Sequence, residues 1–243
     1  MSGPDPDAPA RGLLLDIGGV VLAAGPVLVN RLAEREERLA RLLAPLGGVA
    51  GPRDDLWHRM LVREVSEREY WAVRGAEIVE ALGIDGDGGP TRALMQALYT
   101  GPSAGWLRAQ TLDLMRDVRA AGLGLAALTN DMADFHGREW VAEQEWVALF
   151  DSVVDGSLTG VLKPDPRAYG FAVEAMGLRP EEIVYLDDMP WNVEGGLVAG
   201  LRAVRMPHGD PTAVLAGVRA LLGLPGGTVR ADDGTPDPLD VPA

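Results

Sequence analysis

Short apolar segments that end abruptly in polar residues recur along the chain. Three of them, at 12–15 (GLLL), 123–128 (LGLAAL) and 183–186 (IVYL), are only a few residues long and show no internal alternation. Runs of this length are typical of strands that are buried on both faces of a parallel sheet. Two further strands are predicted at 150–154 and 202–205.

The longer segments between these strands are predicted to be helices. Their ranges are 103–121, 135–148, 165–176, 192–199 and 211–222. Alternation of strands and helices favours a parallel sheet with right-handed crossovers and helices on both faces. The predicted fold class is therefore α/β, a doubly wound parallel sheet of the Rossmann-like type.

Residues 22–102 depart from this alternation because they contain no strand signal. Four helices are predicted there, over 27–43, 55–61, 67–82 and 90–99. The third opens with a capping-box pattern at 66–69 (SERE). We therefore predict an α-helical domain at 22–102, inserted into an α/β core that is formed by 12–21 and 103–223.

The two ends of the chain have a different composition. Residues 1–11 and 224–243 are rich in Pro, Gly and Asp, and we expect them to be disordered tails. The sequence has no run of about 18 or more apolar residues, and its N-terminus lacks the charged-then-apolar pattern of a signal peptide. We expect no membrane span and a cytoplasmic location.

Composition narrows the possible chemistry. The 243 residues include no cysteine, which excludes disulfides, thiolate zinc sites and cysteine nucleophiles. The formal net charge of -14 disfavours nucleic acid as a partner, because binding the phosphate backbone needs a basic surface. A small phosphate ester stays compatible, since a bound cation can reverse the field inside a cleft.

Polar side chains follow the apolar strands at the point where each strand ends. They are Asp16, Thr129, Asn130, Asp187 and Asp188. The carboxyl ends of parallel strands meet in one crevice, where ligands bind. Lys163, in a proline-braced loop at 160–166, is placed to join them. Adjacent carboxylates such as Asp187 and Asp188 need a compensating cation, and Mg²⁺ prefers such oxygen ligands. The set therefore indicates a divalent cation and a phosphate.

The ordered motifs at 16–20 (DIGGV), 129–130 (TN), 163–166 (KPDP) and 187–192 (DDMPWN) resemble those of the haloacid dehalogenase superfamily of hydrolases, most of which are phosphatases. The resemblance covers residues 12–206. It implies a helical cap, at 22–102, that closes over the cleft. A plain helical domain with no role as a lid is the alternative.

The resemblance also implies roles for single residues. Asp16 is expected to be the nucleophile that forms an aspartyl phosphate, and Lys163 is expected to pair with Asp16 and the phosphate. Thr129, with Asn130, is expected to bind the phosphate. The expected Mg²⁺ ligands are Asp16, the Gly18 carbonyl, Asp187 and Asp188, the last directly or through water. Asn192 either orients the loop or caps a helix.

One position departs from the family pattern. The common first motif is Asp-x-Asp-Gly-Thr, whose second Asp is the general acid and base, and this chain has Gly18 there. Three interpretations stay open. The substrate has a good leaving group, as in a sugar 1-phosphate or an acyl phosphate, or another group such as His136 or a cap residue replaces the missing acid. In the third, turnover is slow and the protein mainly binds its ligand. Relatives with an Asp-x-Gly-Asn/Gly-Val motif resemble phosphatases, so loss of activity does not follow.

We therefore expect a Mg²⁺-dependent phosphohydrolase that acts on a small phosphorylated metabolite. The alternatives are a ligand- or protein-binding relative with negligible turnover and, less favoured, a 2-haloacid dehalogenase. The Asp187–Asp188 pair argues against dehalogenation, because those carboxylates would repel the substrate's carboxylate. The three histidines, His58, His136 and His208, are expected to be solvated or capping residues. The substrate and the oligomeric state stay open.

Overall fold

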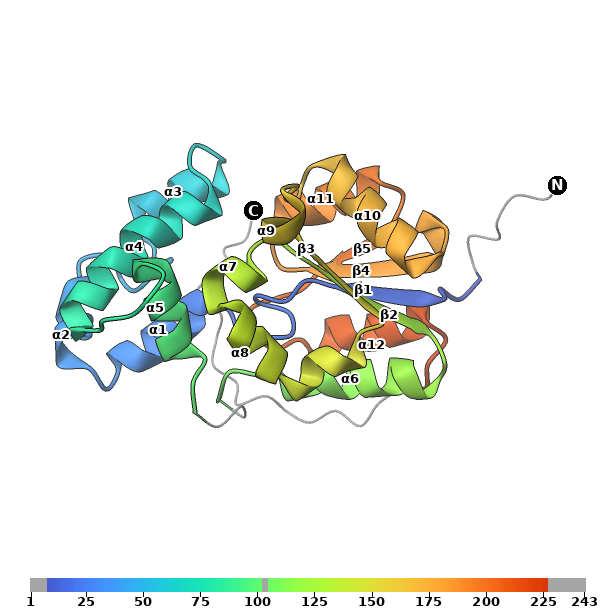
Figure 1. The fold of residues 1–243 in the computed structure, drawn as a ribbon, viewed down its shortest axis with the longest axis horizontal. Coiled ribbons are helices and arrows are strands. Elements are labelled where there is room, and N and C mark those ends of the chain that lie inside the picture. Colours follow the sequence, from blue (N-terminus) through green and yellow to red (C-terminus); the bar gives the residue numbers. More distant parts are fainter. Residues whose placement is uncertain (1–7, 102–104, 227–243) are drawn as a thin grey trace.

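The computed structural model describes residues 8–101 and 105–226. It consists of an α/β core and, at one end of it, a group of helices that we call the helical insert, α1 to α5 (Figure 1). The predicted tails fall largely on residues 1–7 and 227–243, which lie outside the described residues. Inside them, Ala10 is buried and its backbone N–H donates to the Leu221 carbonyl at 2.8 Å. The core therefore includes residues that were assigned to the N-terminal tail.

A five-stranded parallel sheet forms the centre of the core, as predicted. Its strand order is β3-β2-β1-β4-β5. The strands are β1 (Gly12–Leu15), β2 (Gly124–Thr129), β3 (Ser152–Asp155), β4 (Ile183–Asp187) and β5 (Arg202–Arg205). Because β1 lies between β2 and β4, successive crossovers run in opposite directions from it. The sheet therefore has a topological switch point beside β1.

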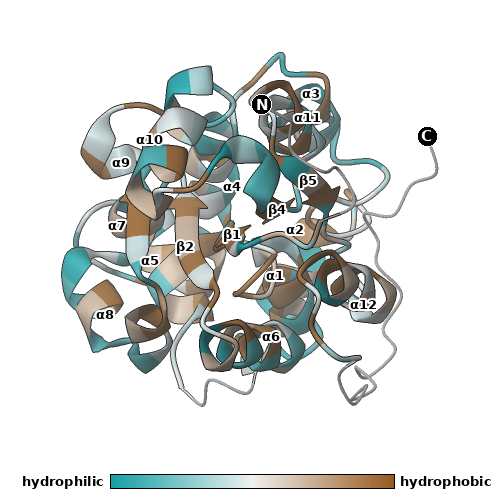
Figure 2. Ribbon diagram, turned by 90° about the vertical axis from the view of Figure 1, so that its right-hand side faces the viewer, coloured by the Kyte–Doolittle hydropathy of each residue, from teal (hydrophilic) through white to brown (hydrophobic). Residues whose placement is uncertain are grey.

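Side chains of the central strands alternate between two apolar clusters. Leu13 and Leu15 point to one face of the sheet and Leu14 points to the other, and all three are fully buried. The first face is covered by α6 (Ala109–Ala120) and α12 (Thr212–Leu221), and the second by α10 (Pro166–Met176) and α11 (Pro190–Val198). Figure 2 shows the resulting apolar strands between two helical layers.

Five helices form the helical insert. They are α1 (Gly25–Ala33), α2 (Glu37–Leu43), α3 (Asp55–Leu61), α4 (Glu67–Leu82) and α5 (Pro90–Leu98). The capping box predicted for the third helix is confirmed, since the Ser66 side chain accepts from the Glu69 backbone and the Glu69 side chain accepts from the Ser66 backbone. Asp54 caps α3 and also accepts from Tyr70 and Arg74, which fixes α3 against α4.

Three predicted helices were wrong in their extent. The helix predicted at 27–43 is two helices, because the chain is extended at Glu36 (φ -115°, ψ 96°) and bends so that both halves bury their leucines. The helix predicted at 135–148 is divided by Gly137, which has φ 88°. The helix predicted from 103 begins at Ala109.

The remaining elements are short. They are α7 (Met132–His136), α8 (Arg138–Glu143), α9 (Gly156–Thr159) and the 3-10 turns η2 (Glu145–Leu149) and η3 (Pro180–Glu182). Among the described residues, no helix combines the length and apolarity that crossing a bilayer requires.

Two neighbouring segments join the core to the helical insert. Leu22 forms an antiparallel bridge with Leu107. Hydrogen bonds flank this bridge on both sides, from the Ala23 N–H to the Trp106 carbonyl at 2.7 Å and from the Arg108 N–H to the Val21 carbonyl at 2.9 Å. The chain therefore leaves the core and returns to it at adjacent points, which explains why α6 begins later than predicted.

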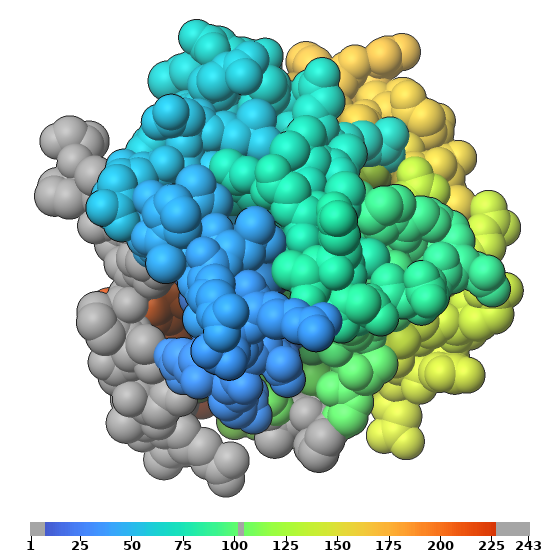
Figure 3. Space-filling model, turned by 90° about the vertical axis from the view of Figure 1, so that its left-hand side faces the viewer, coloured from blue at the N-terminus to red at the C-terminus, as the bar shows by residue number. Residues whose placement is uncertain are grey.

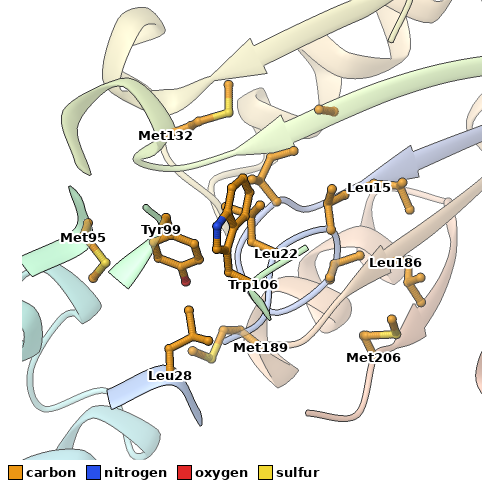
Figure 4. Close-up of a cluster of buried hydrophobic side chains, with 14 of the residues drawn as sticks. Leu15, Leu22, Leu28, Met95, Tyr99, Trp106, Met132, Leu186, Met189 and Met206 are labelled. Atoms are coloured by element: carbon orange, nitrogen blue, oxygen red, sulfur yellow. The ribbon is translucent and has the colours of Figure 1, made fainter. Parts of the chain in front are cut away.

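The helical insert packs on the core through apolar side chains and a few polar contacts. Figure 4 shows Leu28, Met95 and Tyr99 of the insert facing Trp106, Met132 and Met189. Arg68 donates to the buried Asp131 at 2.6 Å, and on the surface Arg92 donates to the Asp134 carbonyl at 2.9 Å. In the view of Figure 3, the helical insert covers most of the visible face of the molecule.

Candidate active site

The register of the sheet brings the predicted polar residues to one edge. Leu15 pairs with Ala127 on one side and with Leu186 on the other, so the next residue, Asp16, lies beside the ends of both neighbouring strands. Thr129 is the last residue of β2 and Asp187 the last of β4. The convergence expected for parallel strands is therefore present, and it is set by local hydrogen bonding.

Lys163 lies between two of these carboxylates. Its Nζ is 2.8 Å from Asp16 Oδ1 and 2.6 Å from Asp187 Oδ2, and its side chain is 1% exposed. Asn130 holds the Lys163 backbone, accepting from its N–H at 2.7 Å and donating to its carbonyl at 3.2 Å. The Asn130 side chain, which was predicted to bind the phosphate, is therefore engaged in fixing the lysine loop.

Asp187 is fully buried and both of its carboxylate oxygens are in use. Oδ1 accepts from the Met189 N–H at 2.9 Å and from Asn192 at 3.2 Å. Oδ2 accepts from Lys163 and from the Tyr185 hydroxyl. Asn192 lies inside α11, and so it orients Asp187 and does not cap the helix.

Asp188 has a different environment. Its Oδ2 is 2.7 Å from Nε2 of His208, a buried residue that was expected to be solvated or capping. The same oxygen lies against Gly19, where an added Cβ would come within 2.1 Å, and Gly19 has φ 70°. A glycine is therefore required at 19 by both space and conformation. At Gly18, by contrast, an added Cβ would meet nothing within 4 Å.

The carboxylates outnumber the cations at this edge. Burial raises the pKa of Asp16 well above its usual range, and the charges of Asp187 and Asp188 raise it further while Lys163 opposes them. One ammonium cannot offset three carboxylates that lie this close together. Full ionisation of the cluster therefore requires a further positive charge.

The cluster fits a hard divalent cation. Single oxygens of Asp16, Asp187 and Asp188 lie within 4.8 Å of one another. Because Asp187 is saturated by protein donors, Asp16 and Asp188 offer the more available oxygens. Oδ1 of Asn192 is buried nearby and has no hydrogen-bond partner among the described residues. An all-oxygen donor set of this kind suits Mg²⁺ and excludes sulfur-ligated metals.

The cleft above these residues has one polar and one apolar side. It encloses about 90 Å³, well below the roughly 300–1,000 Å³ of pockets for drug-sized ligands. Trp57, Trp71 and Tyr99 line the side formed by the helical insert. Thr129 is buried at the floor of the cleft, and its hydroxyl makes no hydrogen bond to any other described residue. The hydroxyl is thus free for a ligand oxygen.

Two further ionisable groups line the cleft: Glu67, which was not singled out in the sequence, and His136, which was considered there as a replacement for the acid at position 18. Burial raises the pKa of Glu67 to about 8, and the charges of Asp188, Asp131 and Asp187 add to the rise against Lys163. Burial alone lowers the pKa of His136 to about 4. The capping box at 66–69 places Glu67 in a first helical turn, but only the packing of α4 over the core brings that turn to the cleft.

The parallel sheet with its switch point and the Asp–Lys–Asp cluster at one edge define a hydrolase of the haloacid dehalogenase type. The family model of the haloacid dehalogenase-like hydrolases matches residues 10–200, and the chain belongs to this family.

Two curated relatives and one solved structure illustrate the similarity. Acyl-CoA dehydrogenase family member 10 of Mus musculus is 25% identical over 218 residues, which are 88% of this chain and 19% of that protein. Phosphoserine phosphatase of Thermus thermophilus is 32% identical over 166 residues, 65% of this chain and 66% of the enzyme. The chain thus spans about a fifth of the mouse protein and just under two thirds of the bacterial phosphatase.

Among solved structures, the magnesium-bound orthorhombic form of the HAD hydrolase YfnB from Bacillus subtilis has a TM-score of 0.59. The two share 18% sequence identity over 82% of this chain and 87% of YfnB. At this identity the likeness establishes the fold.

Proposed function

We propose that this protein is a Mg²⁺-dependent phosphohydrolase that acts on a small phosphate monoester through an aspartyl phosphate. The observation that carries the proposal is the position of Lys163, buried between Asp16 and Asp187 beside the free hydroxyl of Thr129. An ammonium in this place holds one oxygen of the Asp16 carboxylate and leaves the other available for attack on phosphorus.

Each residue of the cluster has a distinct part in this proposal. Asp16 attacks the phosphorus atom, and the Thr129 hydroxyl and Lys163 hold phosphoryl oxygens as charge develops on them. Asp16, Asp188 and the Gly18 carbonyl would hold the cation. Asp187 fixes Lys163, whose Nζ lies 2.6 Å from Asp187 Oδ2. When bound there, Mg²⁺ would supply the positive charge that lets an anionic nucleophile approach an anionic ester.

The charges that line the cleft favour a substrate whose alcohol part is uncharged. The lining includes the carboxyl groups of Asp16, Glu67, Asp131 and Asp188 against the single ammonium of Lys163. Lys163 together with Mg²⁺ suits the phosphate group of a substrate. Among the described residues, no further lysine or arginine lines the cleft to bind a second acidic group on the substrate. The aromatic side chains of the insert suit an apolar or sugar-like face.

The same absence of a second cation disfavours dehalogenation of a 2-haloacid, whose carboxylate would meet acidic side chains. The binding-only alternative rests on Gly18, which removes the usual acid and base of the family from its expected position. We further propose that the helical insert is a cap. Its Arg68 and Arg92 contacts to the segment after β2 hold it over the cleft.

The test is phosphate release from a panel of esters, with Mg²⁺ and with chelator. The panel contains alkyl phosphates, sugar 1-phosphates and nitrophenyl phosphate, together with a carboxylate-bearing ester such as phosphoglycolate. We expect Mg²⁺-dependent release that favours uncharged alcohols and that falls by roughly 10³-fold or more in Asp16→Asn, since removing a nucleophile has effects of this size. Absence of release by folded, metal-loaded protein from every ester would reject hydrolysis in favour of binding.

A further inference from the structure

Glu67 is an unpaired carboxyl group in a cleft whose other acidic groups are engaged. It is the first residue of α4 and lines the cleft together with Asp16 and Lys163, where it is partly exposed. Among residues 8–101 and 105–226, nothing forms a hydrogen bond or an ion pair with it. Asp188, in contrast, contacts His208, and Asp131 is bound by Arg68.

The residues on either side of Glu67 fix it in place. Ser66 is the N-cap of α4 and is locked by Glu69, whose Oε2 accepts from the Ser66 N–H at 2.6 Å. Arg68 donates to Asp131, directly after β2, at 2.6 Å. The first turn of α4 is therefore tied to the core beside the catalytic edge, and this contact holds Glu67 over the cleft.

We propose that Glu67 is the general acid and base of this site, supplying from the helical insert the carboxyl group that position 18 lacks. This inference rests on the proposed function, because it assigns a role within that reaction.

The space around Gly18 agrees with a displaced carboxyl group. No atom lies within 4 Å of a Cβ added there, and the backbone is outside the left-handed region. A side chain at 18 is therefore compatible with the fold, and neither crowding nor conformation requires the glycine. The core leaves this position open, and Glu67 lines the same cleft from the helical insert.

The other ionisable groups of the cleft suit this role less well. The pKa of His136 is lowered to about 4 by burial, so its ring carries no acidic proton near neutral pH. That ring also stacks on Trp140, with ring centres 4.4 Å apart. His208 is held by Asp188. Glu67 combines a free carboxyl group with a pKa of about 8, near the value that suits general acid catalysis.

The two steps balance because Glu67 gives up one proton in the first step and gains one in the second. In the first step, the Asp16 carboxylate forms a bond to phosphorus as the bond to the leaving oxygen breaks, and Glu67 gives its proton to that oxygen to release the alcohol. In the second, the Glu67 carboxylate takes a proton from water while the water oxygen attacks phosphorus. The bond between phosphorus and Asp16 breaks, which releases phosphate and the Asp16 carboxylate, and the proton from water leaves Glu67 protonated again.

The acidic proton sets a direction for pH dependence. Charged and titratable groups face Glu67 from the core and from α5: Asp188, Asp187, Asp131 and Lys163, with Tyr99 nearby. The carboxylates favour the protonated form and Lys163 opposes it. Because the acid form is required in the first step, kcat/KM for an ester with a poor leaving group falls as the pH rises through about 8.

The experiment compares the native protein, Glu67→Gln and the control Glu80→Gln, which changes an exposed carboxyl group on the same helix. Each is assayed with an alkyl phosphate, whose leaving group needs a proton, and with nitrophenyl phosphate, whose leaving group does not. We expect Glu67→Gln to lose about 10²- to 10⁴-fold in kcat/KM for the alkyl ester, to change far less for the aryl ester, and to lose the fall in rate above pH 8. Glu80→Gln should behave as native.

A rescue variant keeps the inference falsifiable. Gly18→Asp in the Glu67→Gln background should restore hydrolysis of the alkyl ester, since a Cβ added at 18 meets nothing within 4 Å. Equal losses with both esters, or no loss with either, would overturn the role of Glu67 while leaving the phosphatase intact. If the native protein hydrolyses neither ester, the proposed function fails first. Unfolding midpoints of all variants separate loss of chemistry from loss of structure.

Discussion

The two sides of the cleft are built in opposite ways. On the core side, Asp16, Lys163, Asp187 and Asp188 each have a partner, and Asp187 alone accepts hydrogen bonds from a lysine, a tyrosine, an asparagine and a backbone N–H. On the side of the helical insert, aromatic rings line the cleft together with one carboxyl group, that of Glu67, which has no hydrogen-bond or ion-pair partner among the residues of the described structure. The core therefore provides fixed charge, and the insert provides an enclosing surface with one free acid.

The cost of disturbing each side differs accordingly. A buried charge that loses its partner destabilises the folded protein strongly, whereas an exposed contact contributes little. Substitutions on the core side should therefore alter stability and activity together. Substitutions of the polar insert residues at the cleft, Glu67 and Arg68, should alter activity alone.

The largest effect on stability is expected for Lys163→Met. It leaves Asp16 and Asp187 as buried carboxylates without their cation, and such a loss costs about 3–5 kcal/mol. The measurement is the free energy of unfolding in urea. Adding Asp187→Asn should recover part of the loss, because the neutral amide needs no counter-charge. An unchanged unfolding midpoint in Lys163→Met would show that the core charges are not coupled as described.

Lys163→Arg adds a sharper comparison at the same position. Lys163 is the only lysine among the chain's 22 Lys and Arg residues. A compact ammonium fits between two carboxylates that lie 2.8 and 2.6 Å from it, while a planar guanidinium requires more room. We expect the arginine variant to retain the charge and still lose most activity.

A smaller effect, on metal binding, is expected for Asp188→Asn. Mg²⁺ that binds only the folded protein should stabilise it by about 2.7 kcal/mol at a concentration of one hundred times Kd. The variant should lose this stabilisation in thermal unfolding and in calorimetric titration, neither of which depends on turnover. Asp87→Asn, in an exposed loop of the insert, is the control and should keep it. Equal Mg²⁺ binding by both variants would contradict the assignment of Asp188.

The smallest effect is expected for Arg68→Gln, which removes the ion pair between the insert and Asp131. The Arg68 side chain is 44% exposed, so the pair contributes roughly 0.2–1 kcal/mol, and Asp131, whose pKa is raised by burial, can take up a proton when it loses this partner. We expect a rise in KM of a few-fold, with little change in the unfolding midpoint, and a weaker response of KM to salt than in the native protein. Arg59→Gln, which breaks an exposed pair within the insert, should not reproduce it. A large loss of stability in Arg68→Gln would refute the contrast between the core side and the insert side of the cleft.

The core side of the site could be predicted from the sequence because its geometry depends on local rules. An apolar run that ends in a carboxylate places that carboxylate at the end of a strand, and parallel pairing then brings Asp16, Thr129 and Asp187 together without further information. The helical insert could be predicted for a similar reason, since the capping box at 66–69 and the glycine at 83 mark the ends of its longest helix.

The rest depends on contacts between distant segments. Asn130 fixes the loop at Lys163, 33 residues away, and His208 contacts Asp188 from 20 residues away. No local pattern encodes either contact. The same holds for Glu67, whose place in the cleft follows from the packing of α4 on the core. The break at Gly137 was missed because an apolar period continues through it, while the backbone there has φ 88°.

The bridge between Leu22 and Leu107 has a consequence for how such proteins diversify. Since the two connecting segments run side by side and are hydrogen-bonded on both flanks, the core chain is already closed where the insert departs. Loop closure becomes only slowly more costly with length, so inserts of very different size can be attached at this junction. At this junction one continuous segment can therefore be exchanged without altering the strands that carry the charged edge of the core.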